Sequence, residues 1–174
     1  MTEEKRIKEF REITKGIFTE KQVKKLVEMG YFRVPASLTH HGTMEGDLYL
    51  HSKMIYLQLE DYTQKLYLSW KARRSPVTIA FLHDLCKVDD YVLEDGEYVW
   101  NKSRVLTGHG DKSAIMALQL FPDLTDEEVM CIRYHMGAYE GKEKWNTLGN
   151  AIKRYPNILW VHQADMITSN VWKV

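Results

Sequence analysis

The chain contains 174 residues, 44% of them hydrophobic, with 24 basic and 24 acidic side chains. This length and apolar content suit one globular domain, and the balanced charge excludes a global positive field that would attract nucleic acid or an anionic membrane. Cys86 and Cys131 are too few for a disulfide framework, and the sequence has no signal-peptide core and no apolar run of transmembrane length. We therefore expect a cytoplasmic protein with two buried thiols and no membrane partner.

The N-terminal part of the chain predicts two short helices followed by a loop. Residues 3–15 place apolar side chains at helical spacing. Thr19 and Gln22 form a capping box that would open a second helix, and Gly30 would end it. Residues 35–46 are rich in loop-forming types and predict irregular structure.

Two helices with polar residues on buried faces are predicted next. Apolar side chains recur every three or four residues over about 46–73, and His51 lies on the same stripe. The following helix, about 77–88, is apolar except where His83 and Asp84 interrupt it. Both segments therefore place polar groups where a core is expected.

The second half begins with a hairpin and continues as helices. Residues 91–100 contain β-type side chains around Asp95-Gly96, a pair that favours a tight turn with positive φ. Thr125 and Glu128 form a second capping box, which opens a helix whose last turn contains His135. The remaining predicted elements are a helix from near Gly110, a helix end at Gly137, a surface loop at 138–146, and helices at about 147–154 and 157–172.

These patterns predict one all-α domain over residues 1–174, with about six or seven helices and one small β-hairpin. Residues 1–34 are expected to form an N-terminal helical cap, and residues 35–172 the helical core.

Six potential metal ligands lie on or at the end of these predicted helices. They are His51, His83, Asp84, His109, His135 and Asp165. Imidazole and carboxylate groups are ligands of divalent metals, and helical bundles place such ligands in their interior from successive helices. The sequence therefore predicts a metal site inside the core.

The two aspartates of this set are the most informative members. Burying a carboxylate without a partner is costly, and a metal ion is the simplest partner that Asp84 and Asp165 could share. Two independent caps or ion pairs, with Lys87 and Lys153 available, are the alternative.

Local geometry favours ligation. His83 and Asp84 are consecutive, so their side chains diverge by about 100° around a helix but still reach one ion, and the two carboxylate oxygens of Asp84 could bridge two ions. The helix N-terminus at His109 disfavours the imidazolium form and so helps to keep the ring neutral.

The order His…His-Asp…Asp resembles the HD-domain superfamily of metal-dependent phosphohydrolases. The segments that carry the resemblance, over about residues 35–172, are HGTMEGDLYLHS, FLHDLCK, HGDKS, IRYHMG and QADMI. Cys86 stands in FLHDLCK where glycine is common in that superfamily.

The resemblance implies an HD-domain helical bundle and its ligand set. It places His51, His83, Asp84 and Asp165 around a first ion, and His109 and His135 around a second ion, with Asp84 bridging. The implied ions are two divalent metals, drawn from Mn, Fe, Mg, Ni, Co or Zn. The implied reaction is hydrolysis, through metal-activated water, of a phosphoester in a nucleotide or similar small phosphorylated substrate. The candidate catalytic residues are Asp84, Lys87, His109 and His135.

The substrate-side candidates rest on position alone. Lys87 follows Asp84 by three residues and could neutralise a substrate phosphate, or could be a solvated lysine at a helix end. Lys112 is a similar candidate, and His41 with its neighbour His40 could contact phosphate or act as a general acid. Cys86 is expected to pack, and His162 either to orient Asp165 or the substrate, or to pack in the core.

Three other functions stay open at this stage. One is a 3′–5′ phosphodiesterase or exonuclease acting on oligonucleotide ends, which would make nucleic acid a partner. Another is an HD-type di-iron oxygenase, and a third is a binding module without activity. The sequence does not exclude a homo-oligomer.

Overall fold

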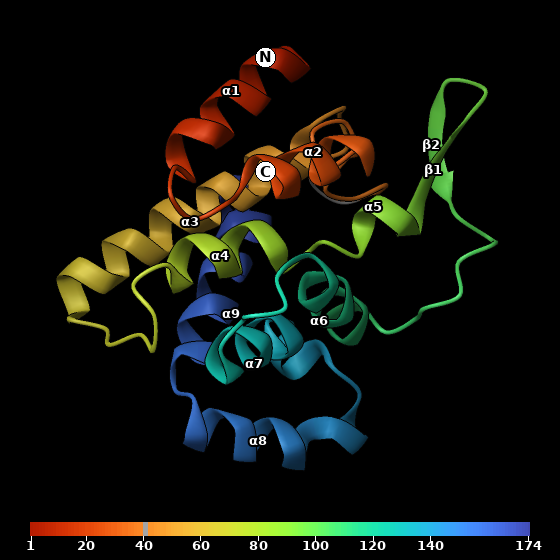
Figure 1. Ribbon diagram of the computed structural model, residues 1–174. Helices are drawn as coiled ribbons and strands as arrows, with labels where there is room; N and C mark the ends of the chain where they lie inside the picture. The colour runs from red at the N-terminus through yellow and green to blue at the C-terminus, as the bar shows by residue number, and fades with distance from the viewer. Residues whose placement is uncertain (40–41) are drawn as a thin grey trace.

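The computed structural model describes residues 1–39 and 42–174, which are mostly helical with one two-stranded antiparallel sheet (Figure 1). The helices are α1 (Glu3–Ile13), α2 (Glu20–Glu28), α3 (Asp47–Leu66), α4 (Ser75–Leu82), α5 (Lys87–Asp90), α6 (His109–Leu120), α7 (Asp126–Tyr134), α8 (Trp145–Arg154) and α9 (Asn157–Ile167). The strands are β1 (Tyr91–Glu94) and β2 (Glu97–Trp100). Short 3-10 turns η1 (Gly137–Tyr139) and η2 (Lys142–Lys144) lie in the predicted loop at 138–146, and the π-helical turn η3 (Thr168–Trp172) extends α9. The predicted helical class with one hairpin is confirmed.

Both predicted capping boxes are present. The Thr19 hydroxyl accepts from the backbone N–H of Gln22 at 3.3 Å, and the side-chain oxygen of Gln22 accepts from the backbone N–H of Thr19 at 2.7 Å. Thr125 and Glu128 make the same reciprocal pair at the start of α7. Gly30, with φ of +79°, ends the turn after α2 as predicted, because a left-handed residue is readily supplied by glycine.

The N-terminal helices share the core of the main body. The ring of Phe10 on α1 is fully buried. Its centroid lies 5.2 Å from that of Phe32 and 4.9 Å from that of Phe81 on α4. The predicted cap at 1–34 therefore packs directly against the helix that leads to His83.

The predicted helix at 46–73 is too long, because α3 ends at Leu66. Tyr67 adopts a left-handed conformation with φ of +54°, and the amides of Tyr67 and Leu68 both donate to the Thr63 carbonyl. The Trp70 indole N–H then donates to the Thr63 hydroxyl at 2.8 Å, so the chain folds back on the helix end. Residues 67–73 contain no glycine or proline that would have signalled this stop.

The predicted single helix at 77–88 is also wrong, because it is divided into α4 and α5. Residues 83–86 form a turn in which the Leu85 amide donates to the Leu82 carbonyl and the Lys87 amide to the Asp84 carbonyl. Each of these hydrogen bonds spans three residues, as in a 3-10 turn, which is wound more tightly than an α-helix. His83 and Asp84 therefore lie at the end of α4 rather than within a helix.

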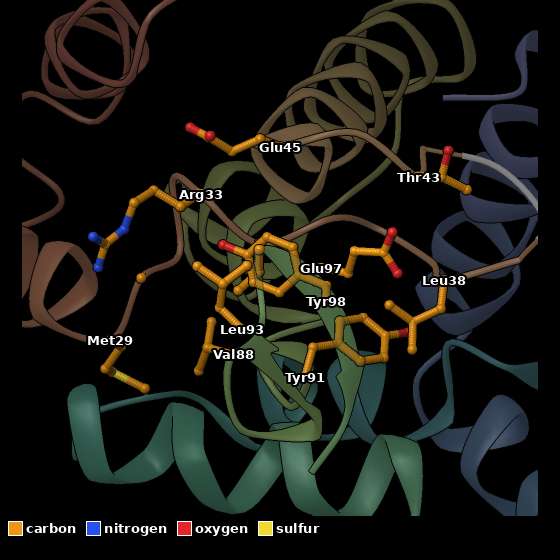
Figure 2. Close-up of a pocket in the computed structure, with 13 residues that line it drawn as sticks. Met29, Arg33, Leu38, Thr43, Glu45, Val88, Tyr91, Leu93, Glu97 and Tyr98 are labelled. Atoms are coloured by element: carbon orange, nitrogen blue, oxygen red, sulfur yellow. The ribbon is translucent and has the colours of Figure 1, made fainter.

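The hairpin lies where it was predicted. Tyr91 pairs with Trp100 across the two strands, and Asp95 and Gly96 both have positive φ at the turn. The hairpin follows α5 directly and projects from the helical body (Figure 1). Between it and residues 29–38 and 43–45 lies a cleft of about 750 Å³ (Figure 2).

Two further properties bear on the expectations from composition. Cys86 and Cys131 are both buried free thiols, as predicted. In the part of the chain that the structure describes, no helix combines the length and the apolar character needed to cross a bilayer.

Candidate metal centre

The fold brings the six predicted ligands together from five helices. His51 comes from α3, His83 and Asp84 from the end of α4, His109 from the first residue of α6, His135 from the end of α7, and Asp165 from α9. These elements pack on one another around the same buried region (Figure 1). Residues separated by more than a hundred positions therefore share one site.

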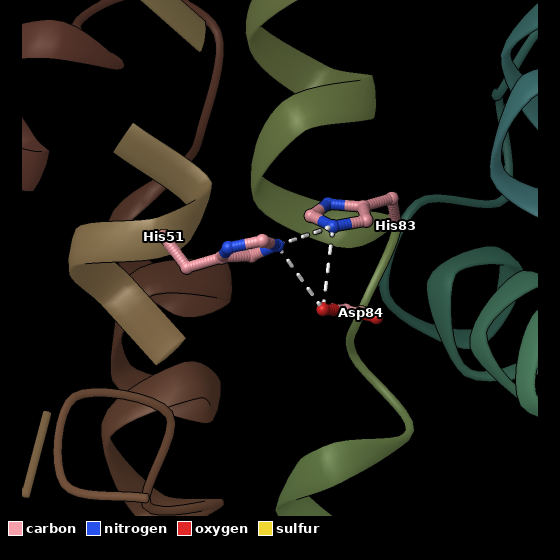
Figure 3. A group of neighbouring side chains, drawn as sticks. All are labelled: His51, His83 and Asp84. Atoms are coloured by element: carbon pink, nitrogen blue, oxygen red, sulfur yellow. Dashed lines mark hydrogen bonds and ion pairs between the residues drawn. The ribbon is translucent and has the colours of Figure 1, made fainter. Parts of the chain in front are cut away.

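Asp84 lies at the middle of the group, and its two oxygens face different histidines. Oδ2 lies 3.5 Å from Nε2 of His51 and 3.3 Å from Nε2 of His83 (Figure 3). Oδ1 lies 2.6 Å from Nε2 of His109 and 3.5 Å from Nε2 of His135. Within each half, the ligand atoms lie within 4.8 Å of one another.

Asp165 completes the half that contains His51. Its Oδ1 lies 3.3 Å from Nε2 of His51 and accepts from the Ser169 hydroxyl at 3.1 Å. Ser169 follows Asp165 by four residues, which is the spacing of neighbours on a helix face, so this partner could have been expected from the sequence.

The three fully buried histidines share one arrangement of their outer ring nitrogens. The Nδ1 atoms of His51, His83 and His135 lie 2.8, 2.8 and 2.7 Å from the backbone oxygens of Val174, Ala80 and Ile132. A backbone oxygen only accepts, so in each pair Nδ1–H is the donor. Each neutral ring therefore turns the lone pair of Nε2 toward the carboxylates, which is the orientation that a metal ligand requires.

This donor set fits a divalent cation. Nε2 of His51 and Nε2 of His83 are only 3.3 Å apart. In neutral rings these are two lone pairs facing each other, an unfavourable contact that a cation between them would relieve. Nε2 of His135 is buried and has no hydrogen-bond partner among the described residues. An unpaired buried polar atom is costly, and a bound ion with nitrogen and oxygen ligands would satisfy these atoms together.

The electrostatics favour the ionised forms of Asp84 and Asp165 and the neutral form of His83. Burial by itself would raise the pKa of Asp84, but the charge of Lys87, followed by the neighbouring imidazoles, outweighs it and the pKa is well below its usual range. Burial is likewise outweighed at Asp165, where the neighbouring imidazoles, His51 first, lower the pKa of the carboxyl. Burial lowers the pKa of His83 and so favours its neutral ring.

Lys87 is neither solvated nor free. It is buried, and its amine lies 2.6 Å from Oδ2 of Asp84. Burial alone would lower the pKa of Lys87, but Asp84 raises it above the usual value. The ion pair considered as an alternative for Asp84 is therefore present beside the histidines, whereas Lys153 is exposed on α8.

The other substrate-side candidates lie elsewhere. The buried amine of Lys112 contacts Asp89 at 2.5 Å and Asp90 at 2.7 Å, which ties α6 to α5 and directs this charge away from Asp84. His40 and His41 lie outside the described residues.

His162 supports the centre indirectly. Its Nδ1 lies 2.8 Å from the backbone oxygen of His135, and a Cβ at Gly137 would come within 2.7 Å of its ring. It therefore packs against the chain that leaves α7, one of the two roles considered from the sequence.

Cys86 makes a polar contact that the sequence reading missed. Its Sγ lies 3.2 Å from Nδ1 of His109, so His109 is held between the thiol and Oδ1 of Asp84. Burial raises the pKa of Cys86 well above the usual value, which favours the protonated thiol. The only sign of this contact in the sequence is that Cys86 follows Asp84 by two residues. In the structure both residues lie in the turn between α4 and α5.

Solvent reaches the centre on one side. The side chains of His109 and Asp165 are 31% and 13% exposed, whereas those of His51, His83 and His135 are fully buried. A ligand from solution therefore meets His109 and Asp165 first.

Comparisons with family models, with curated proteins and with solved structures found no match to this chain. The functional assignment therefore rests on the geometry and chemistry of this buried cluster.

Proposed function

We propose that the protein is a metal-dependent phosphohydrolase of the HD-domain type, which cleaves the phosphoester of a nucleotide or a similar small phosphorylated molecule. The observation that carries the proposal is the position of Asp84, whose two oxygens face separate pairs of histidines. A single carboxylate between two nitrogen pairs is suited to bridge two cations.

Six side chains would hold the ions. His51, His83, Asp84 and Asp165 form the first group, and Asp84, His109 and His135 form the second. Bound ions would supply Lewis acidity toward a substrate phosphate and a water molecule. The donor set contains no thiolate in either group and suits Mn, Fe, Co, Ni or Zn.

The surrounding residues prepare these ligands. The amine of Lys87 keeps Asp84 ionised without adding a competing acceptor, and backbone oxygens hold the three buried imidazoles with Nε2 inward. Because the ring positions are held by packing and hydrogen bonds before any ion binds, little reorganisation is needed on binding. The exposed edge of His109 is the side on which a phosphate would approach.

The decisive experiment compares metal content and hydrolysis in Asp84→Asn with the native protein. The near-isosteric amide keeps the shape of the site but loses the charge shared by both groups. We expect two ions per native chain by elemental analysis, hydrolysis in a screen of nucleotides with Mn²⁺, and loss of both in Asp84→Asn. Asp123→Asn is a matched control, because Asp123 pairs with Arg74 on the surface.

The outcomes separate the competing functions. Undiminished hydrolysis in Asp84→Asn with unchanged metal content would exclude the cluster as the active site. Oxygen consumption by iron-loaded protein, without hydrolysis, would favour the di-iron oxygenase. No binding of any divalent metal would favour a binding module.

The number of ions is tested separately by His109→Ala and His135→Ala. Each variant should lose about one ion per chain while keeping the other, because both histidines belong to the second group. Unchanged metal content in both variants would indicate a single ion.

A further inference from the structure

The cleft between the hairpin and residues 29–38 and 43–45 has the size of a small-ligand site. Its volume of about 750 Å³ lies within the range of roughly 300–1,000 Å³ that is typical of such sites. Its described lining residues come from the end of α2, the connection to α3, the last turn of α5 and both strands (Figure 2). None of them belongs to the metal centre, so the cleft is a separate feature.

The wall formed by α5 and β1 links the cleft to the metal centre. Tyr91 lines the cleft and is 7% exposed. It comes directly after α5, which begins at Lys87, the partner of Asp84. Burial raises the pKa of Tyr91 to about 12, with opposing contributions from the charges of Lys87 and Asp84. Tyr91 is therefore a residue of the cleft wall that follows Lys87 by four positions along the chain.

The opposite wall reaches the centre as well. Leu38 and Thr43 line the cleft, and Figure 2 shows Leu38 beside the ring of Tyr91. Next to Thr43, a Cβ on Gly42 would lie 3.3 Å from the backbone of Val174, whose oxygen holds the ring of His51. Both walls thus run from the cleft toward ligands of the first group.

The lining chemistry favours an aromatic, largely uncharged group over a phosphate chain. Tyr91 and Tyr98 offer aromatic surface, and apolar residues such as Val88 surround them. Among the described lining residues, the charges are the carboxylates of Glu45 and Glu97 and the guanidinium of Arg33. Glu45 pairs with Arg6 at 3.1 Å and Arg33 lies 3.6 Å from Glu3, so the lining has no excess of positive charge for a run of phosphates, while Glu97 can accept hydrogen bonds from the edge of a base or the hydroxyls of a sugar.

From these observations we infer that the cleft binds the nucleoside part of the substrate, while the phosphate extends past Tyr91 to the metal centre. The inference rests on the proposed function and adds a substrate class to it: a single nucleotide, recognised by base and sugar. A longer oligonucleotide would have to pass its next phosphates through a cleft that contains the carboxylate of Glu97 and no excess of positive charge.

The experiment measures binding of unphosphorylated nucleosides by calorimetry, with metal removed by a chelator. Nucleosides carry no group for the metal centre, so binding reports on the cleft alone. Tyr98→Ala should weaken binding by roughly tenfold or more, because stacking on an aromatic ring contributes on that scale. Glu97→Gln, on the exposed hairpin, should weaken the binding of nucleosides that donate hydrogen bonds. Tyr139→Ala, in which a 70% exposed tyrosine outside the cleft is removed, is the matched control and should bind normally.

Each outcome has one meaning. Nucleoside binding that is weakened in Tyr98→Ala and normal in Tyr139→Ala supports the inference, even if no metal or hydrolysis is found and the proposed function fails. Equal binding by all variants overturns it. Phosphoester hydrolysis without measurable nucleoside binding also overturns the inference but leaves the proposed function intact. Tighter binding of an oligonucleotide than of a mononucleotide overturns the inference as well. Circular dichroism of each variant checks that the fold is retained.

Discussion

At the level of single residues, His109 differs from the other histidines of the centre. In His51, His83 and His135 the Nδ1–H group donates to a backbone oxygen. Nδ1 of His109 instead lies 3.2 Å from the thiol of Cys86. A backbone oxygen only accepts, and so it selects one tautomer, whereas a thiol can donate or accept. His109 is therefore the ligand whose orientation depends on a side chain specific to this sequence.

Replacing Cys86 by alanine should weaken binding of the second ion. Loss of an outer partner of a ligating histidine typically costs about 10–100-fold in metal affinity. We expect this loss in Mn²⁺ titrations for the ion held by His109 and an unchanged affinity for the other ion. Cys131→Ala, which removes the other buried thiol, is the control. Equal affinities in both variants would contradict the role of the thiol.

Metal affinity should depend on pH through His135. Burial by itself would lower the pKa of His135, but the neighbouring carboxylate of Asp84, whose Oδ1 lies 3.5 Å from Nε2, raises it above the usual value. The metal-free protein therefore keeps a proton on this ring at a higher pH than an ordinary histidine, whose pKa is about 6.5. Because a protonated ring cannot ligate, affinity should fall as pH falls, beginning above about pH 6.5.

This pH dependence is measured by metal titrations from about pH 8 to about pH 6. His135→Ala should keep only the ion of the first group, so the pH dependence that begins above the ordinary histidine range should be absent in this variant. An affinity for the second ion that is constant across this range in the native protein would contradict the prediction.

At the level of secondary-structure elements, the two capping boxes have different consequences. The pair at Thr19 is exposed and local. At the start of α7, Glu128 is fully buried and also accepts from the Ser75 hydroxyl at 3.1 Å and from Arg74 at 3.3 Å. It therefore joins the starts of α4 and α7, the two helices whose far ends place His83 and His135 in the centre.

Glu128→Ala should therefore destabilise the protein far more than Gln22→Ala does. Removing the buried carboxylate leaves the Ser75 hydroxyl and the Thr125 amide without their acceptor, and each unsatisfied buried group costs about 1–3 kcal/mol, while Arg74 keeps Asp123 as its partner. Removing one member of the exposed box should cost about 1 kcal/mol. Urea unfolding followed by circular dichroism measures both, and equal losses would argue against the connecting role of Glu128.

At the level of the whole molecule, the centre exists only in the folded chain. Its ligands come from α3, α4, α6, α7 and α9, so an unfolded chain cannot present them together. Any ion that binds the centre must therefore stabilise the fold.

Addition of Mn²⁺ to the metal-free protein should raise its Tm. At a free concentration of about 100 times Kd the stabilisation is about 2.7 kcal/mol for one site. For a chain of this length that corresponds to a rise in Tm of roughly 5–10 °C. Asp84→Asn should show almost no rise, because the shared carboxylate is lost. The same rise in native protein and variant would place the stabilising ion elsewhere.

The sequence by itself determined the features that depend on neighbours along the chain. The capping boxes at Thr19 and Thr125 and the hairpin turn at Asp95 lie where local pattern predicted them, because a few adjacent residues contain the whole interaction. The six candidate ligands, which the structure brings together, could also be selected from sequence, since charged and imidazole groups on apolar helix faces require a buried partner.

Only the tertiary structure decided which partners those groups have. Helix α3 stops at Leu66 because Trp70 folds back onto Thr63, and no local stop signal marks that position. The amine of Lys112 finds Asp90 rather than solvent, and the ring of His51 is held by Val174, 123 residues away. Such contacts depend on how helices pack rather than on local preference, so side-chain types can be read from the sequence while their pairing is set by the fold.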